Sequence, residues 1–133
     1  MTILQTLHGE MRWLLVLLAV LAIVKFAVGW LTKAEYKPMD RGIMSGFVGL
    51  VDLNVTLGLI LIIGLGITQG IWPGFRWEHA FTMIIAAAVA HSSAAWRKSE
   101  DSAKKFRNNL FVVLGTLVII AMGVIRLRGG WIW

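Results

Sequence analysis

The chain has 133 residues, is 58% hydrophobic and carries a formal net charge of +6 at pH 7. Soluble domains are on average about 45–50% apolar, so this composition favours a protein that lies in a bilayer. The chain contains no cysteine, which excludes disulfides, iron–sulfur clusters and thiolate-bound metals.

Four apolar stretches, taken in chain order, predict four membrane-spanning helices at about residues 10–32, 43–68, 78–97 and 106–126. A helix rises about 1.5 Å per residue, so about 20 residues cross a hydrocarbon core of about 30 Å. The connections are short, and we therefore expect neighbouring helices to be antiparallel. The sequence predicts an all-α integral membrane protein whose single domain, residues 1–133, is an antiparallel four-transmembrane-helix bundle.

The basic residues gather on one side of this predicted bundle. Eight of them lie in or beside the first and third connections: Lys33, Lys37, Arg41, Arg97, Lys98, Lys104, Lys105 and Arg107. The opposite side has four, which are Arg12, Arg76, Arg126 and Arg128. Short loops rich in Lys and Arg stay in the cytoplasm, so we expect a multi-pass protein of the bacterial inner membrane with both termini outside. The positive charge then indicates topology and attraction to anionic lipid head groups rather than binding to nucleic acid.

Two of the three histidines, His8 and His79, are expected at the same depth. His8 precedes the first apolar stretch and His79 opens the third, and both positions face the outer side in an up-down bundle. Two opposed imidazoles can be the axial ligands of one haem iron. The alternative is that both are ordinary polar residues of the membrane interface.

A haem at this depth also needs a slot for its flat ring and cations for its propionates. Small residues stand at the outer ends of the second and fourth stretches, including Gly66 and Gly123. The candidate propionate ligands are Arg12, Arg76 and Arg126. Glu10 or Glu78 is a candidate acceptor for the second N–H of a ligand imidazole. Glycines in membrane helices also serve simply to let helices approach, which is the alternative reading of the slot.

A second cluster, Lys25, Asp52 and His91, falls inside the apolar stretches on the inner side. An unpaired charge at that depth costs at least about 2.5 kcal/mol, so we expect a Lys25–Asp52 ion pair with His91 hydrogen-bonded to Asp52. Such a cluster suits a proton relay or a quinone head-group site. It also suits a polar network that only fixes helix packing, with the lysine extending to the inner surface. His91 follows His79 by twelve residues, or about 18 Å of helix, so the two cannot share a metal.

Three segments resemble small four-span bacterial membrane proteins described as cytochrome b or cytochrome b561-like. LHGEMRW (7–13) is similar to their opening H-x-x-x-R-W, and WEHAFTMIIAAAVAHSSA (77–94) is similar to their third helix. Asp52 with the following Gly58-Leu59-Ile60 resembles their second helix. Two haems would need four histidine ligands and the chain has three, so the resemblance implies at most one haem b, at His8 and His79.

These patterns favour a membrane electron-transfer protein or subunit that links the quinone pool to an outer-face partner. It need not be an enzyme on its own. The alternative is an accessory or structural subunit of a larger respiratory or photosynthetic complex, or a homo-oligomer, that binds lipid, a chlorophyll-type pigment or no cofactor. Chlorophyll needs a single axial ligand, so one histidine would suffice. A carrier for ions or solutes built on the inner cluster is a third hypothesis.

Overall fold

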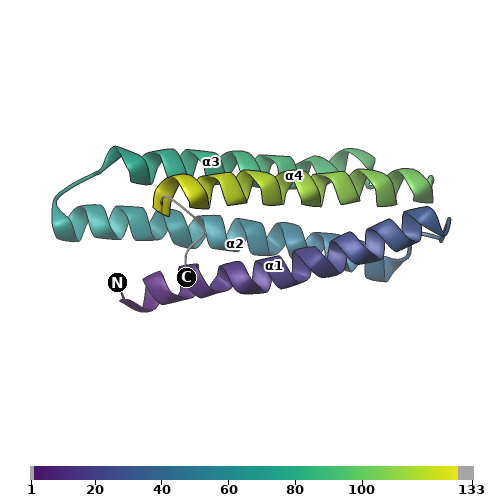
Figure 1. Ribbon diagram of the computed structural model, residues 1–133, viewed down its shortest axis with the longest axis horizontal. Helices are drawn as coiled ribbons and strands as arrows, with labels where there is room; N and C mark the ends of the chain where they lie inside the picture. The colour runs from purple at the N-terminus through teal and green to yellow at the C-terminus, as the bar shows by residue number, and fades with distance from the viewer. Residues whose placement is uncertain (1, 129–133) are drawn as a thin grey trace.

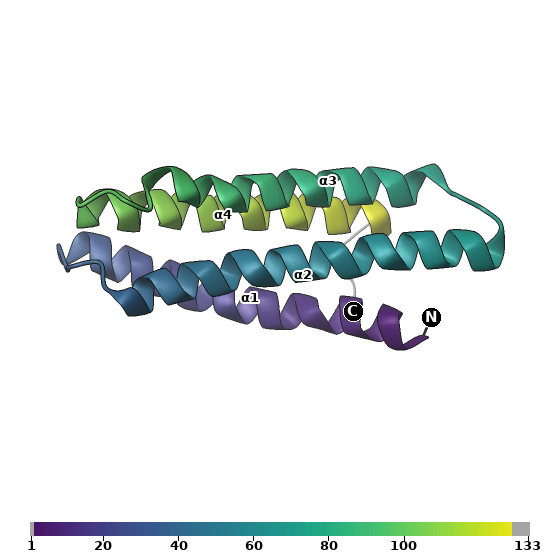
Figure 2. The same cartoon turned by 180° about the vertical axis from the view of Figure 1, so that it is seen from behind.

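The computed structural model describes residues 2–128, and the side chains of residues 3–125. This part of the chain forms four α-helices with a short 3-10 helix before the last (Figure 1). Their bounds are α1 Thr2–Leu31, α2 Pro38–Gln69, α3 Gly74–His91, η1 Ser92–Trp96 and α4 Ser102–Arg128. The chain doubles back at each connection, and Figure 2 shows the same arrangement from behind.

Three of the described helices contain segments long and apolar enough to cross a membrane: Ile3–Leu31, Pro38–Gln69 and Ser102–Ile125. The third expected span, residues 78–97, is different. α3 has 18 residues, carries charged side chains in its first two turns and ends at His91, where η1 replaces the α-helix. The apolar part of this α-helix is therefore shorter than the span predicted from the sequence.

Each helix packs against two neighbours. α1 contacts α2 and α4, while α3 also contacts α2 and α4, so α1 and α3 lie diagonally across the bundle. The start of α1, the α2–α3 connection and the end of α4 lie together, and we call this the histidine end. The other two connections form the opposite end, which we call the basic end. α1 and α4 are close at the basic end and diverge toward the histidine end (Figures 1 and 2).

Backbone geometry explains where the long helices end. Lys33 adopts a left-handed conformation (φ 57°), and the Ala34 N–H donates to the Gly29 carbonyl at 2.9 Å, which closes the last turn of α1. Pro38 occupies the first turn of α2, where a missing N–H costs nothing. Gly70 ends α2 with a φ of 70°, which a residue without a Cβ adopts readily.

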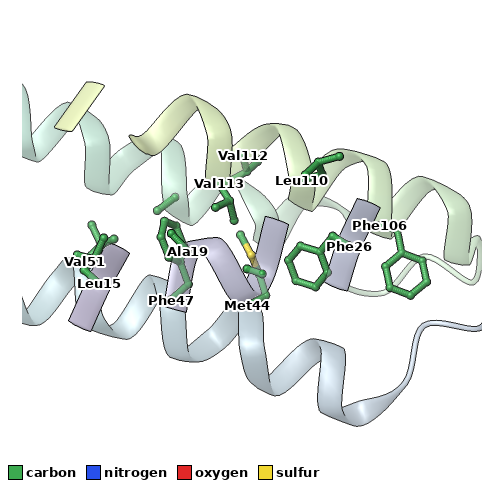
Figure 3. Close-up of a cluster of buried hydrophobic side chains, with 12 residues drawn as sticks. Leu15, Ala19, Phe26, Met44, Phe47, Val51, Phe106, Leu110, Val112 and Val113 are labelled. Atoms are coloured by element: carbon green, nitrogen blue, oxygen red, sulfur yellow. The ribbon is translucent and has the colours of Figure 1, made fainter. Parts of the chain in front are cut away.

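The hydrophobic core lies in the middle of the bundle and toward the basic end. Its largest fully buried side chains are Phe26 from α1, Phe47 from α2 and Phe106 from α4. The rings of Phe26 and Phe106 lie side by side, and Phe47 lies further along the bundle toward the histidine end (Figure 3). A Cβ on Gly29 would lie 2.5 Å from the Phe106 ring, so α1 and α4 are in close contact there. Leu15 and Val51 mark the limit of this core toward the histidine end. Beyond them the four helices surround a cavity.

Candidate functional site

The cavity at the histidine end has a volume of about 440 Å³ and is bounded by residues of all four long helices. His8 from α1 and His79 from α3 both line it. Leu15 and Val51 form part of its wall where it meets the core. Cofactor sites in proteins are typically about 300–1,000 Å³ and mostly apolar, and this cavity fits that description. The two histidines that sequence depth paired therefore face one space.

His8 is held by the backbone of α2. Its Nδ1 lies 3.0 Å from the Asn54 carbonyl oxygen. A carbonyl can only accept, so Nδ1 carries the proton and Nε2 carries the lone pair. The ring reaches this carbonyl across Gly58, one turn along α2, where a Cβ would lie 2.9 Å from His8 Cε1. The missing side chain at Gly58 is what allows the imidazole to lie against the helix.

His79 is held in the same way by α4. Its Nδ1 donates to the Gly123 carbonyl oxygen at 3.3 Å, so its Nε2 also carries the lone pair. A Cβ on Gly123 would lie 2.5 Å from the methyl group of Met83, so α3 and α4 approach closely at this level. Histidines that ligate metals usually donate their second ring N–H to a carbonyl or carboxylate, which fixes the tautomer and the ring orientation. Backbone carbonyls, rather than Glu10 or Glu78, are these acceptors.

The two glycines expected to form the ring slot have other neighbours. A Cβ on Gly66 would lie 2.3 Å from the Trp72 ring, so that position receives an indole. Neither Gly66 nor Gly123 lines the cavity, whereas Gly9 and Gly58 do. The sequence analysis estimated how deep each glycine lies along its helix, but not toward which side of the helix it faces. Gly58 and Gly66 are eight residues apart, so they face directions that differ by about 80° around the helix axis. The spacing of Gly58 one turn after Asn54 is the sequence signal that could have identified this side of the cavity, but the sequence analysis did not use it.

The cavity wall also contains cationic and amide groups. Arg12 and Arg76 both line it. Arg76 Nη2 donates to Gln69 Oε1 at 3.0 Å, while its buried Nη1 has no hydrogen-bond partner among the described side chains. The same is true of Asn54 Oδ1. Buried polar atoms are normally paired, so Arg76 Nη1 is available to bind a polar group at the wall. The Arg126 side chain lies outside the described residues.

The residues that line the cavity include side chains that could hold a haem b. No group of three or more His, Asp or Glu side chains within the described region is placed to hold a bare metal ion. Haem brings four ring nitrogens of its own and needs only axial ligands, which His8 and His79 can supply from diagonal helices. The cavity offers apolar walls for the ring and two guanidinium groups for anionic propionates.

The inner cluster is arranged differently from the expectation. His91 Nε2 lies 2.9 and 2.7 Å from the two carboxylate oxygens of Asp52, as expected. Lys25 instead pairs with Asp40, Nζ to Oδ1 3.3 Å. Because α2 begins at Pro38, Asp52 lies about 21 Å from the basic end of α2, and Asp40 only about 3 Å. Lys25 lies about 9 Å from the end of α1, which brings it closer to Asp40.

The Asp52–His91 pair lines a second cavity of about 430 Å³, which we call the basic groove. The pair is only partly covered, since the Asp52 and His91 side chains are 43% and 57% exposed. The other polar residues of the groove come from both connections, the first turn of α2, η1 and α4, and the sequence analysis did not assign them to a groove. They include Tyr36, Arg41, Trp96, Arg97, Lys105 and Asn109.

A hydrogen-bond chain ties the wall of the basic groove together. Trp96 Nε1 donates to Asn109 Oδ1 at 2.7 Å, and Asn109 Nδ2 donates to the Tyr36 hydroxyl at 2.9 Å. Burial, together with the charge of Asp40, raises the pKa of Tyr36 to about 12. The Asn109 amide and the charges of Arg41 and Arg97 act in the opposite direction on that pKa. The hydroxyl is therefore neutral and hydrogen-bonded at physiological pH.

Comparison of the chain with protein families, curated proteins and solved structures found no match. Any functional assignment therefore depends on the geometry of the two cavities and on the short motifs around His8 and His79.

Proposed function

We propose that the chain is a b-type cytochrome-like electron-transfer protein of the membrane that holds one haem between His8 and His79. The observation that carries this proposal is that both imidazoles line one cavity, each with Nδ1 bonded to a backbone carbonyl of a neighbouring helix. His8 and His79 are 71 residues apart in sequence, yet both carry the proton on Nδ1 and both line the same cavity.

Each residue that lines the cavity would have one role in holding the haem. His8 and His79 supply the axial nitrogens, and the Asn54 and Gly123 carbonyls orient the rings and raise the basicity of Nε2. Arg12, Arg76 and Arg126 hold the propionates, and the apolar wall excludes water from the ring. The bound haem would supply reversible one-electron chemistry of its iron.

The proposed setting is the bacterial inner membrane, with the four helices forming an antiparallel transmembrane bundle. α3 would be the shortest span, and the basic end would face the cytoplasm. Both termini and the haem would then lie toward the outside, next to an outer-face partner. The partly exposed Asp52–His91 pair would meet a quinol head group from the membrane and accept its proton.

A reduced-minus-oxidised absorption spectrum of the purified protein tests the haem proposal. We expect a sharp b-type α-band that is lost in both His8→Ala and His79→Ala. His91→Ala is the matched control, because it removes an imidazole that lines the basic groove and not the haem cavity. Circular dichroism checks that each variant keeps its helices.

Three outcomes would overturn the proposal. The first is a folded protein that stays colourless after addition of haem. The second is an α-band that persists in either ligand variant. The third is a far-red chlorophyll-type band, which would favour the accessory role in a larger complex.

A further inference from the structure

The mouth of the basic groove gathers positive charge from three elements around Tyr36. Arg41 belongs to α2, Arg97 follows η1 and Lys105 belongs to α4. Lys105 Nζ lies 5.2 Å from the centre of the Tyr36 ring. Arg41 and Arg97 both approach closely enough to lower the pKa of that hydroxyl. Residues far apart in the chain therefore bring three cations to one place.

Two acidic side chains near these cations are already paired with other residues. Asp40 is paired with Lys25, and Asp52 with His91. Among the described side chains, Arg41, Arg97 and Lys105 form no salt bridge. Like charges that converge repel one another, so an arrangement of this kind is stabilised by a bound anion.

The shape of the groove indicates what kind of anion. The guanidinium group matches phosphate in geometry and charge and binds it through two parallel N–H bonds. Beyond the mouth, the groove is lined by the apolar side chains of Met44 and Val48, about one and two turns further along α2 than Arg41, before it reaches the Asp52–His91 pair. A cationic mouth at a helix end above an apolar wall fits an amphiphile whose phosphate lies at the head-group level.

We propose that the basic groove binds the phosphate of one anionic phospholipid, held by Arg41, Arg97 and Lys105, with an acyl chain along Met44 and Val48. This site does not depend on the haem at the histidine end, and the lipid phosphate would occupy the mouth of the groove, above the Asp52–His91 pair that lies deeper along α2. It differs from general attraction to an anionic surface, because only the cations that line the groove would matter. Lys98 and Lys104 are exposed cations of the same end that do not line it.

Lipid binding can be measured by native mass spectrometry of the detergent-solubilised full chain, titrated with phosphatidylglycerol. The unaltered protein should bind it at least about tenfold more tightly than phosphatidylcholine with the same acyl chains. Arg41→Gln/Arg97→Gln should weaken phosphatidylglycerol binding by about tenfold or more, the effect of losing one charge-assisted contact. Lys98→Gln/Lys104→Gln removes the same net charge and should bind as the unaltered protein does.

Two results would overturn the proposal: equal affinity for the two lipids, or equal weakening in the two double variants. A third arm uses inorganic phosphate as competitor. Displacement of the lipid by phosphate at a comparable concentration would overturn the lipid assignment and identify a site for soluble phosphate. The lipid comparison and the phosphate competition use the unaltered chain, so they decide the matter even if the arginine variant does not fold.

Discussion

Gly58→Ala tests whether the imidazole of His8 must lie where it does. The added methyl would lie 2.9 Å from His8 Cε1 and 3.4 Å from Nε2, and the first distance is shorter than real contacts of this kind. The ring is the movable end of a side chain, so it should swing away from α2 while the backbone stays in place. The bond from Nδ1 to the Asn54 carbonyl would be lost.

The expected change in stability follows from two opposing effects. Losing the hydrogen bond costs about 0.5–1.5 kcal/mol, and replacing glycine by alanine inside a helix gains up to about 1 kcal/mol. Gly58→Ala should therefore leave the protein between about 1.5 kcal/mol less stable and about 0.5 kcal/mol more stable. Gly49→Ala in the same helix is the control: nothing lies within 4 Å of its added methyl, so it should stabilise by up to about 1 kcal/mol.

Two measurements on both variants decide the matter. Thermal unfolding followed by circular dichroism should show Gly49→Ala as the more stable variant, and a haem titration should show weakened binding in Gly58→Ala only. If Gly58→Ala matches Gly49→Ala in stability and also keeps the α-band at the same haem affinity, then the fixed position of His8 is not needed, and the reasoning about this ring is refuted.

Three further predictions concern the basic end. Tyr36 is the only tyrosine of the sequence, so tyrosinate absorption should titrate with a midpoint near pH 12, and with a lower midpoint in Asp40→Asn. This folded-state pKa lies above the usual value of about 10. The stability that the neutral hydroxyl contributes is therefore complete below pH 10, and thermal unfolding scans should show its loss between pH 10 and 12. Asp40→Ala should cost about 1–3 kcal/mol of unfolding free energy, because it removes both the acceptor of the Lys37 N–H, at the N-cap of α2, and the partner of Lys25. A smaller loss than in Lys25→Met would contradict this. Gly29→Ala should cost about 1–3 kcal/mol in denaturant unfolding, because its methyl meets the Phe106 ring, and Phe106→Leu should relieve part of that loss.

Much of the fold could be predicted from the sequence, because length and apolar pattern determine where membrane-length helices form. Three helices are long and apolar enough within the described residues, and Pro38 and Gly70 stand at the ends of α2. The third span was overestimated. Its apolar composition continues past His91 through two alanines and a tryptophan, but the backbone tightens into η1 there. Composition alone does not distinguish these two kinds of helix.

The sequence predicted how far along the helices the candidate site residues lie, but not which side of each helix they face. A fixed rise per residue correctly brought His8 and His79 to one cavity and Asp52 to His91. Which face a glycine presents depends on helix start and side-chain packing, so Gly66 was assigned to the slot in place of Gly58. Lys25 was assigned to the wrong acid because α2 begins five residues earlier than expected.

The uneven distribution of the core has a consequence for how a large flat ligand could enter. Contacting aromatic rings from α1, the first connection and α4 pack the basic half of the bundle, whereas the first turns of α1 border a cavity. Segments with fewer packed contacts open at lower free energy than the core does. We therefore predict that the amino-terminal turns of α1 open more readily than the core, and this opening would admit the proposed haem while the core stays packed. Hydrogen exchange should be fastest in those turns and should slow when the ligand is bound.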